Sequence, residues 1–269
     1  MSGPRVAVVQ FPGVNCEAES VRALTRAGLA ADVFGWTRPA AELRDYDAYL
    51  LPGGFSYQDR VRGGALASKD PLVDVLADEA ARGKPVIGIC NGAQVLVEAG
   101  LVPDGGVVEL ALARNHMLDR GGYYARWIYV RIEPSPCLFT RGIPPGTVVP
   151  LPVAHGEGRF MSRDPDRMPA LARQGQVPLR YASLAGEPAD AFPLNPNGAE
   201  QAAAAVCNAR GNVLAIMPHP ERAQDLGGLS RAIAGPWAER RERAAAVGGV
   251  DEEGPGMLFF HGLRQHLKG

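Results

Sequence analysis

The feature that most constrains this fold is a short apolar run that ends in a cysteine and leads directly into a helical pattern. Pro85–Ile89 predicts a buried strand, Cys90 follows it, and Gly88 and Gly92 flank the cysteine. Flanking glycines let a chain turn sharply from a strand into a helix, an arrangement called a nucleophile elbow. A helix amino terminus favours negative charge and therefore the thiolate of Cys90. The alternative is a buried core cysteine.

Strand and helix patterns alternate through the first ninety residues. The strand patterns are Arg5–Gln10, Ala31–Phe34, Asp47–Leu51 and Pro85–Ile89, and the clearest helical patterns between them are Glu17–Ala27 and Pro71–Ala81. Such alternation is typical of βαβ units with a parallel sheet. In these sheets, reactive and binding groups gather outside the carboxyl ends of the strands. The loops that meet this condition are Phe11–Cys16, Pro52–Asp59 and the turn at Cys90.

The pattern changes after Gly100. Antiparallel strands are predicted at Arg126–Ile132, Thr147–Val153 and Val177–Ala182, a last buried strand at Val213–Met217 and a final helix at Met257–Leu267. We therefore predict one α/β domain over residues 1–269. It has an open, mostly parallel sheet with helices on both faces, as in flavodoxin-like folds, and a small antiparallel extension. The segment 234–256, charged with glycine-rich flanks, is expected to be a surface insertion.

The composition argues against several classes of partner. The chain has 269 residues, 21% of them charged, and a net charge of −1, so it has no field that would attract nucleic acid or anionic lipid. No apolar run approaches the roughly 18 residues that cross a bilayer. We expect a cytoplasmic protein with no nucleic-acid or membrane partner. The four cysteines are far apart and form no C-x-x-C pair, which argues against a metal site and a disulfide framework.

A base for the thiol is predicted near the other end of the chain. A nucleophilic cysteine needs a base, and the base needs an orienting acceptor. The run Met217-Pro-His-Pro-Glu221 follows a strand pattern and supplies both groups. A separation of two puts His219 and Glu221 on one side of an extended chain. We predict a catalytic triad of Cys90, His219 and Glu221, with a structural histidine as the alternative.

The glycines at 53 and 54 indicate a further part of the site. Attack on an amide carbonyl creates an oxyanion, which fixed backbone N–H groups can stabilise. The run Leu51-Pro-Gly-Gly-Phe-Ser56 stands at a predicted strand end, and glycine allows a close approach to the substrate. The N–H groups of Gly54 and Asn91 are the candidate oxyanion donors. An ordinary tight turn is the alternative interpretation of the glycine pair.

Motifs along nearly the whole chain resemble one family. They are Phe-Pro-Gly-Val-Asn-Cys at 11–16, Leu-Pro-Gly-Gly-Phe-Ser-Tyr at 51–57, Gly-Ile-Cys-Asn-Gly at 88–92, Ala-His-Gly-Glu-Gly-Arg at 154–159, Asn-Pro-Asn-Gly at 195–198 and Met-Pro-His-Pro-Glu-Arg at 217–222. The chain thereby resembles the class I glutamine amidotransferases, and in particular the glutaminase subunits of phosphoribosylformylglycinamidine synthase. Cys-Asn-Gly together with His-Gly-Glu-Gly carries the narrower resemblance.

The resemblance implies a reaction and its residues. Cys90 attacks the side-chain amide of glutamine, a γ-glutamyl thioester forms, ammonia leaves, and water hydrolyses the thioester. His219 acts as base and then acid, and Glu221 orients it. Gln94, Gly156 and Glu157 hold the glutamine.

The resemblance also implies partners. Ammonia passes to a synthetase subunit that converts formylglycinamide ribonucleotide to formylglycinamidine ribonucleotide in purine biosynthesis, together with a small accessory subunit. No cofactor is expected in this chain, because ATP and Mg²⁺ belong to the synthetase, and this sequence has no P-loop. Weak activity is expected without the partner.

Three further residues need an interpretation. Cys16 follows a loop rather than an elbow, so we interpret it as structural, and we interpret His155 in the same way. Gln58 stands where the family usually has glycine, which puts the conformation of its loop in question. Two other functions remain open at this stage: a free-standing γ-glutamyl or peptide cysteine hydrolase, and a non-enzymatic redox or scaffold protein.

Overall fold

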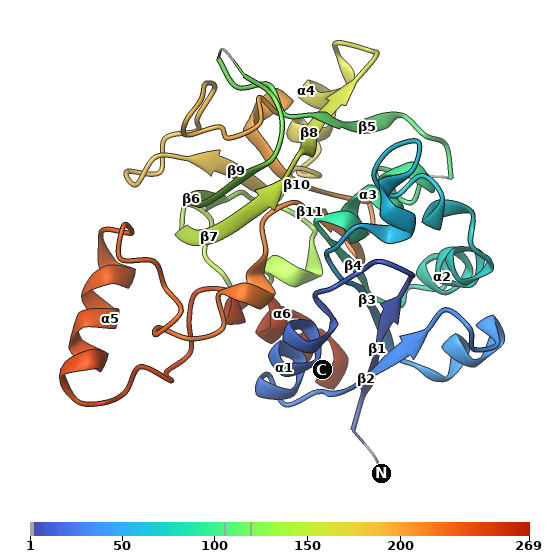
Figure 1. The fold of residues 1–269 in the computed structure, drawn as a ribbon, viewed down its shortest axis with the longest axis horizontal. Helices are drawn as coiled ribbons and strands as arrows, with labels where there is room; N and C mark the ends of the chain where they lie inside the picture. The colour runs from blue at the N-terminus through green and yellow to red at the C-terminus, as the bar shows by residue number, and fades with distance from the viewer. Residues whose placement is uncertain (1–2, 105, 119) are drawn as a thin grey trace.

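The computed structural model describes residues 3–104, 106–118 and 120–269, and its centre is a nine-stranded sheet (Figure 1). In spatial order the strands are β2 (Ala30–Gly35), β1 (Arg5–Gln10), β3 (Ala48–Leu51), β4 (Val86–Ile89), β11 (Val213–Ile216), β10 (Ala203–Cys207), β9 (Leu179–Ala182), β6 (Tyr124–Ile132) and β7 (Val148–His155). The five strands from β2 to β11 are parallel, and the other four continue the same sheet in antiparallel pairs. The predicted α/β sheet is confirmed.

Helices cover both faces of the parallel part. The helices are α1 (Glu17–Arg26), α2 (Pro71–Ala81), α3 (Asn91–Glu98), α4 (Arg167–Arg173), α5 (Pro236–Ala246) and α6 (Met257–Lys268). Helices α1 and α6 lie on one side of the parallel strands, and α2 and α3 lie on the other (Figure 1). Helix α2 begins where it was predicted because Asp70 accepts the Leu72 N–H and Pro71 takes the first helical position.

Some elements of the structure differ from those that the sequence pattern predicts. A separate two-stranded sheet pairs β5 (Leu110–Arg114) with β8 (Glu157–Ser162). Strand β10 was missed because its sequence, Ala-Ala-Ala-Val-Cys, is rich in the best helix-forming residue, and only pairing with β11 and β9 makes it a strand. The elements α4 and α5 were also not predicted.

The expected insertion at 234–256 has two parts. Helix α5 stands away from the sheet (Figure 1). The segment after it returns to the body of the protein, where Leu226 N–H donates to Glu252 and the N–H groups of Gly254 and Gly256 donate to Gln224 and Ala223. The projecting part is therefore α5, and the last residues of the segment support the chain just after the short 3-10 helix η6 (Pro220–Arg222).

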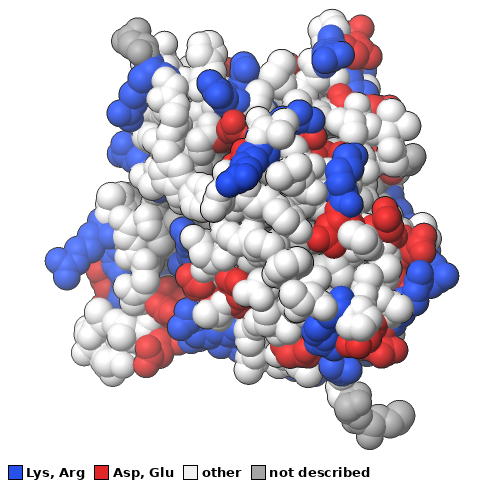
Figure 2. Space-filling model, turned by 45° about the vertical axis from the view of Figure 1, so that its right-hand side comes forward, with Lys and Arg blue, Asp and Glu red and all other residues white. Residues whose placement is uncertain are grey.

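The surface carries charges of both signs, interspersed on the face shown in Figure 2. This agrees with the near-zero net charge of the whole chain. Within the described residues, no helix combines the length and the apolar character that crossing a membrane requires.

Candidate active site

Cys90 occupies a strained turn between β4 and α3. Its backbone has φ 53° and ψ −104°, a conformation that L-residues rarely adopt. A Cβ at Gly88 would lie 2.4 Å from the Gly92 carbonyl oxygen, and a Cβ at Gly92 would lie 2.1 Å from that of Leu51. Both glycines are therefore required by close packing. The turn has the geometry of an elbow, with the cysteine at the carboxyl end of β4 and the amino end of α3.

His219 and Glu221 form a buried pair just beyond β11, the strand next to β4. His219 Nδ1 lies 2.5 Å from Glu221 Oε1, and the two residues are 1% and 0% exposed. Glu221 is thus placed to accept the Nδ1 hydrogen and to fix the orientation of the ring. His219 Nε2 has no hydrogen-bond partner among the described residues. The nitrogen that a catalytic base would use is free.

The charges around His219 favour its protonated form. Burial opposes a charge on the ring, but the negative charges of Glu221 and Cys90 outweigh it and hold the pKa of His219 well above its ordinary value. Cys90 is itself only 6% exposed, and its Sγ lies 3.6 Å from the Ala154 carbonyl oxygen of β7. The structure therefore brings the three residues of the predicted triad into one buried cluster.

The two candidate oxyanion donors lie on either side of this turn, Gly54 in the loop after β3 and Asn91 at the first position of α3. The Gly53 carbonyl accepts the N–H groups of Asn15 at 3.1 Å and Cys16 at 3.2 Å. Because the C=O and N–H of one trans peptide point in opposite directions, these bonds also fix the direction of the Gly54 N–H. Within the described chain, the N–H groups of Gly54 and Asn91 have no hydrogen-bond partner.

The Asn91 side chain ties the loop after Gly54 to α3. Its Oδ1 accepts the Ser56 N–H at 2.9 Å, and its Nδ2 donates to Asp59 Oδ1 at 3.0 Å. Burial, together with the nearby charge of Glu157, raises the pKa of Asp59 to about 6. Gln58 lies in this loop with φ 60°, in the left-handed region that favours glycine. This explains why a glycine fits the same position in the family that the sequence resembles.

The three predicted glutamine-binding residues are brought together. Gln94 Nε2 donates to the Glu157 carbonyl oxygen at 2.7 Å, and Gln94 Oε1 accepts from Asn91 Nδ2 at 2.8 Å. The Glu157 carboxylate accepts the Gly63 N–H at 3.0 Å. Gly156 makes the turn between β7 and β8 that carries Glu157 to α3. These contacts place a second set of polar groups beside the start of α3, one turn away from Cys90.

His155 lies in the same turn but has a different role from His219. Asn115 Nδ2 donates to two carbonyl groups, so Asn115 Oδ1 is the acceptor of the His155 Nδ1 hydrogen at 3.0 Å. Burial and the neighbouring charge of His219 lower the pKa of His155 to about 3. The ring is therefore neutral, with its hydrogen on Nδ1.

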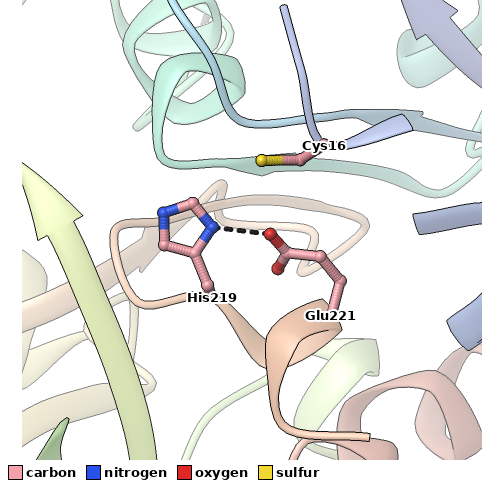
Figure 3. Close-up of side chains that lie close together, drawn as sticks. All are labelled: Cys16, His219 and Glu221. Carbon is pink, nitrogen blue, oxygen red and sulfur yellow. Dashed lines mark hydrogen bonds and ion pairs between the residues drawn. The ribbon is translucent and has the colours of Figure 1, made fainter. Parts of the chain in front are cut away.

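The surroundings of Cys16 were not predicted from the sequence. Cys16, His219 and Glu221 lie within 4.8 Å of one another through their possible metal-binding atoms (Figure 3), the one such group in the part of the chain that the structure describes. Arg222 Nη2, however, donates to Cys16 Sγ at 2.9 Å, and this positive charge opposes a cation there. In the sequence, Arg222 is only the last residue of a family motif, and nothing there indicates a contact with Cys16.

Two aromatic rings lie side by side near the site. The centroids of Phe55 and Tyr123 are 6.4 Å apart, and both side chains are about half exposed. Burial raises the pKa of Tyr123, and the charge of Cys90 adds to this effect. The Tyr123 hydroxyl is thus within electrostatic reach of the thiol.

Comparisons with known proteins agree on one family. The CobB/CobQ-like glutamine amidotransferase domain family matches residues 3–261. The phosphoribosylformylglycinamidine synthase subunit PurQ of Methanothrix thermoacetophila is 46% identical, over 98% of both chains, and that of Thermus thermophilus is 44% identical, over 82% of this chain and 90% of its own.

A solved structure gives the same result. A chain of the structure of PurLQS from Thermotoga maritima is 31% identical, with a TM-score of 0.71, over 98% of this chain and 99% of its own. The chain therefore belongs to the CobB/CobQ-like glutamine amidotransferase family and, within it, to the glutaminase subunits that are named PurQ.

Proposed function

We propose that this protein releases ammonia from glutamine through a thioester on Cys90. The observation that carries the proposal is the buried His219–Glu221 pair, bonded at 2.5 Å, next to a cysteine on a strained elbow. The His219 ring takes the thiol proton and, as an imidazolium, returns it to the leaving ammonia. A water that loses a proton to the same ring then hydrolyses the thioester, and glutamate leaves. Glu221 holds the ring in orientation and stabilises its charge.

The remaining site residues bind and polarise the substrate. The N–H groups of Gly54 and Asn91 stabilise the oxyanion, which is supported by their lack of other partners among the described residues. Gln94, Gly156 and Glu157 hold the α-amino and α-carboxylate groups of glutamine. Support for this assignment comes from their position together beside the start of α3. No cofactor in this chain takes part in these steps.

The ammonia is used by a partner. The relatives carry the name phosphoribosylformylglycinamidine synthase subunit, and the similar structure is that of PurLQS. We infer that this chain binds a synthetase subunit, which holds ATP and Mg²⁺ and forms formylglycinamidine ribonucleotide, and a small accessory subunit. We place the complex in the cytoplasm, where free thiols such as the four buried cysteines stay reduced.

The decisive test compares two cysteine variants in the complex with the synthetase. Cys90→Ala should abolish glutamine-dependent synthesis and leave ammonia-dependent synthesis intact, because only the nucleophile is lost. Cys137→Ala, a buried thiol outside the site, is the matched control and should keep both activities. Loss of ammonia-dependent synthesis in Cys90→Ala would contradict a purely catalytic role. Ammonia release that the synthetase does not change would instead favour a free-standing hydrolase, and no turnover by the wild-type protein would favour a redox or scaffold protein.

A further inference from the structure

We infer that Cys16 and Arg222 form a positioning pair that holds the His219–Glu221 pair in place and balances the charge of the site. The inference rests on the proposed function, because it assigns the pair to the same reaction. Neither residue is the nucleophile or the base. They act through His219 and Glu221. Cys16 lies directly beside both residues (Figure 3), and Arg222 Nε lies 3.9 Å from Glu221 Oε1.

The hydrogen bonds of Cys16 fix its sulfur in one orientation. Cys16 is fully buried, its sulfur accepts from Arg222 Nη2 at 2.9 Å, and it lies 3.3 Å from Asn15 Oδ1, which is placed to accept the S–H. The backbone N–H of Cys16 donates to Gly53. One residue thus contacts both the arginine beside Glu221 and the loop that carries the proposed oxyanion donor.

The sulfur also limits the movement of the His219 ring. A Cβ at Gly53 would lie 2.8 Å from His219 Cε1 and 3.1 Å from Cys16 Sγ, so the ring and the sulfur pack against the same glycine. Position 53 therefore has no room for a side chain beside the ring and the sulfur. Because interiors are close-packed, removing the sulfur opens a space into which the ring can move.

Arg222 supplies a positive charge that balances the net negative charge of the site. A thiolate, an imidazolium and the Glu221 carboxylate together carry one net negative charge, and unbalanced buried charge is costly. Arg222 Nε lies 3.9 Å from Glu221 Oε1, and no other Lys or Arg of the described residues pairs with this carboxylate. Burial lowers the pKa of Arg222, but the contacts with Cys16 and Glu221 raise it by a larger amount. The guanidinium is therefore charged. The other titratable groups that act on this cluster are Cys90, His155 and Tyr123.

The test measures Cys90 itself, without turnover. The rate of Cys90 alkylation by iodoacetamide is followed against pH in the full-length protein, with peptide mass spectrometry separating Cys90 from the other thiols. For Arg222→Met we expect the midpoint to rise by about one pH unit, because a nearby cation is lost. Arg222→Lys keeps the charge and should restore most of the wild-type midpoint.

Steady-state kinetics in the synthetase complex provide the second readout. Arg222→Met should lower kcat about tenfold, the equivalent of one pKa unit, with the glutamine KM changed less than twofold. Cys16→Val, which removes the sulfur contacts, should lower kcat by several-fold, whereas Cys16→Ser keeps a donor and acceptor and should remain a glutaminase. A KM effect without a kcat effect would assign the pair to substrate binding and overturn the inference.

The possible failures can be told apart. A wild-type alkylation midpoint in Arg222→Met overturns the positioning role, whatever the activity of this variant. If Arg222→Met does not fold, as judged by circular dichroism, the kcat of Cys16→Val decides, and a wild-type kcat overturns the inference. An active Cys90→Ala variant would instead overturn the proposed function.

Discussion

Two turns of this protein carry the same sequence pattern, a histidine followed two residues later by a glutamate. One follows β11 and contains His219 and Glu221, and the other joins β7 to β8 and contains His155 and Glu157. In the first turn the ring and the carboxylate are bonded to each other. In the second, the ring is bonded to Asn115, and the carboxylate accepts a backbone N–H from another loop. The pattern by itself does not determine whether the glutamate bonds to the histidine two residues before it.

The local backbone accounts for the difference. Pro220 begins the 3-10 helix η6, which folds the chain back so that the Glu221 side chain returns to the His219 ring. Gly156 instead leads directly into β8, so Glu157 belongs to an extended strand and its carboxylate reaches the loop at Gly63. The turn that folds back therefore pairs His219 with Glu221. In the turn that enters a strand, His155 and Glu157 bond to other segments.

The two histidines show that burial alone does not set a protonation state. They are 1% and 2% exposed, yet the pKa of His219 lies well above its ordinary value and that of His155 is lowered to about 3. The partner decides the direction: a carboxylate stabilises the charged ring, and a neutral amide oxygen does not outweigh the cost of burial. The first ring is suited to proton transfer, and the second is suited to a fixed structural contact.

Neutralising each glutamate in turn should separate the roles of the two turns most strongly. Glu221→Gln should lower the glutaminase kcat by about 10³-fold or more, because the ring loses the negative charge that stabilises its protonated form. Glu157→Gln should change kcat little and raise the glutamine KM about tenfold, since a single polar contact to substrate is weakened. The measurement is ammonia release in the synthetase complex. Equal losses of kcat in the two variants would show that the turns are not functionally distinct.

The opposite protonation preferences can be tested through stability. His155 is neutral in the fold and has an ordinary pKa near 6.5 when unfolded, so its contribution is complete above pH 6.5 and is lost as pH falls toward 3. Because of His155 alone, the free energy of unfolding should fall by about 2 kcal/mol between pH 7 and pH 5. His219 has the opposite sign: its contribution is complete below pH 6.5 and is lost as pH rises through its raised folded value.

Urea unfolding at several pH values provides the measurement. His155→Asn, which keeps an amide donor for Asn115, should flatten the loss of stability between pH 7 and pH 5 relative to the wild-type protein. The slopes of unfolding free energy against pH are compared, because a loss of packing in the variant lowers its stability equally at every pH. A variant with the wild-type slope would contradict a neutral His155.

The Gln94 amide links the second turn to α3, and its removal should have a moderate effect. Gln94→Ala should raise the glutamine KM about tenfold and leave kcat within about threefold, because the substrate loses a binding group and a support of the Glu157 backbone. Initial rates of ammonia release against glutamine concentration measure both constants. Gln174→Ala, on the exposed end of α4, is the control. An unchanged glutamine dependence in Gln94→Ala would remove this residue from the site.

A small change in stability is expected at Gln58, in the loop that the Asn91 side chain ties to α3. Gln58 is exposed and has φ 60°, so Gln58→Gly relieves strain while losing only a surface contact to Arg60. We expect a gain of about 0.5 kcal/mol in unfolding free energy, since the relief of strain exceeds the added freedom of the unfolded chain. Urea unfolding measures it, with Gln58→Ala as a control that keeps the strain. A loss of stability in the glycine variant would show that the side chain supports the loop.

The parallel half of the molecule was predictable because its signals are local. Apolar runs bounded by glycine mark β1, β3 and β4, and Gly88 and Gly92 mark the elbow by the same close packing that the structure shows. The alternation of elements was sufficient to predict the sheet that aligns these strand ends. These short-range patterns are therefore sufficient to predict the fold class and the position of the candidate nucleophile.

The groups that surround the nucleophile come from contacts between distant segments of the folded chain. Strand β10 exists because it pairs with β11, and Arg222 meets Cys16 across a separation of 206 residues. The different partners of His155 and His219 likewise come from distant segments or from how a turn folds back. Hydrogen bonds and charges between remote segments leave no short-range pattern in the chain, so the protonation of the site is a property of the folded protein alone.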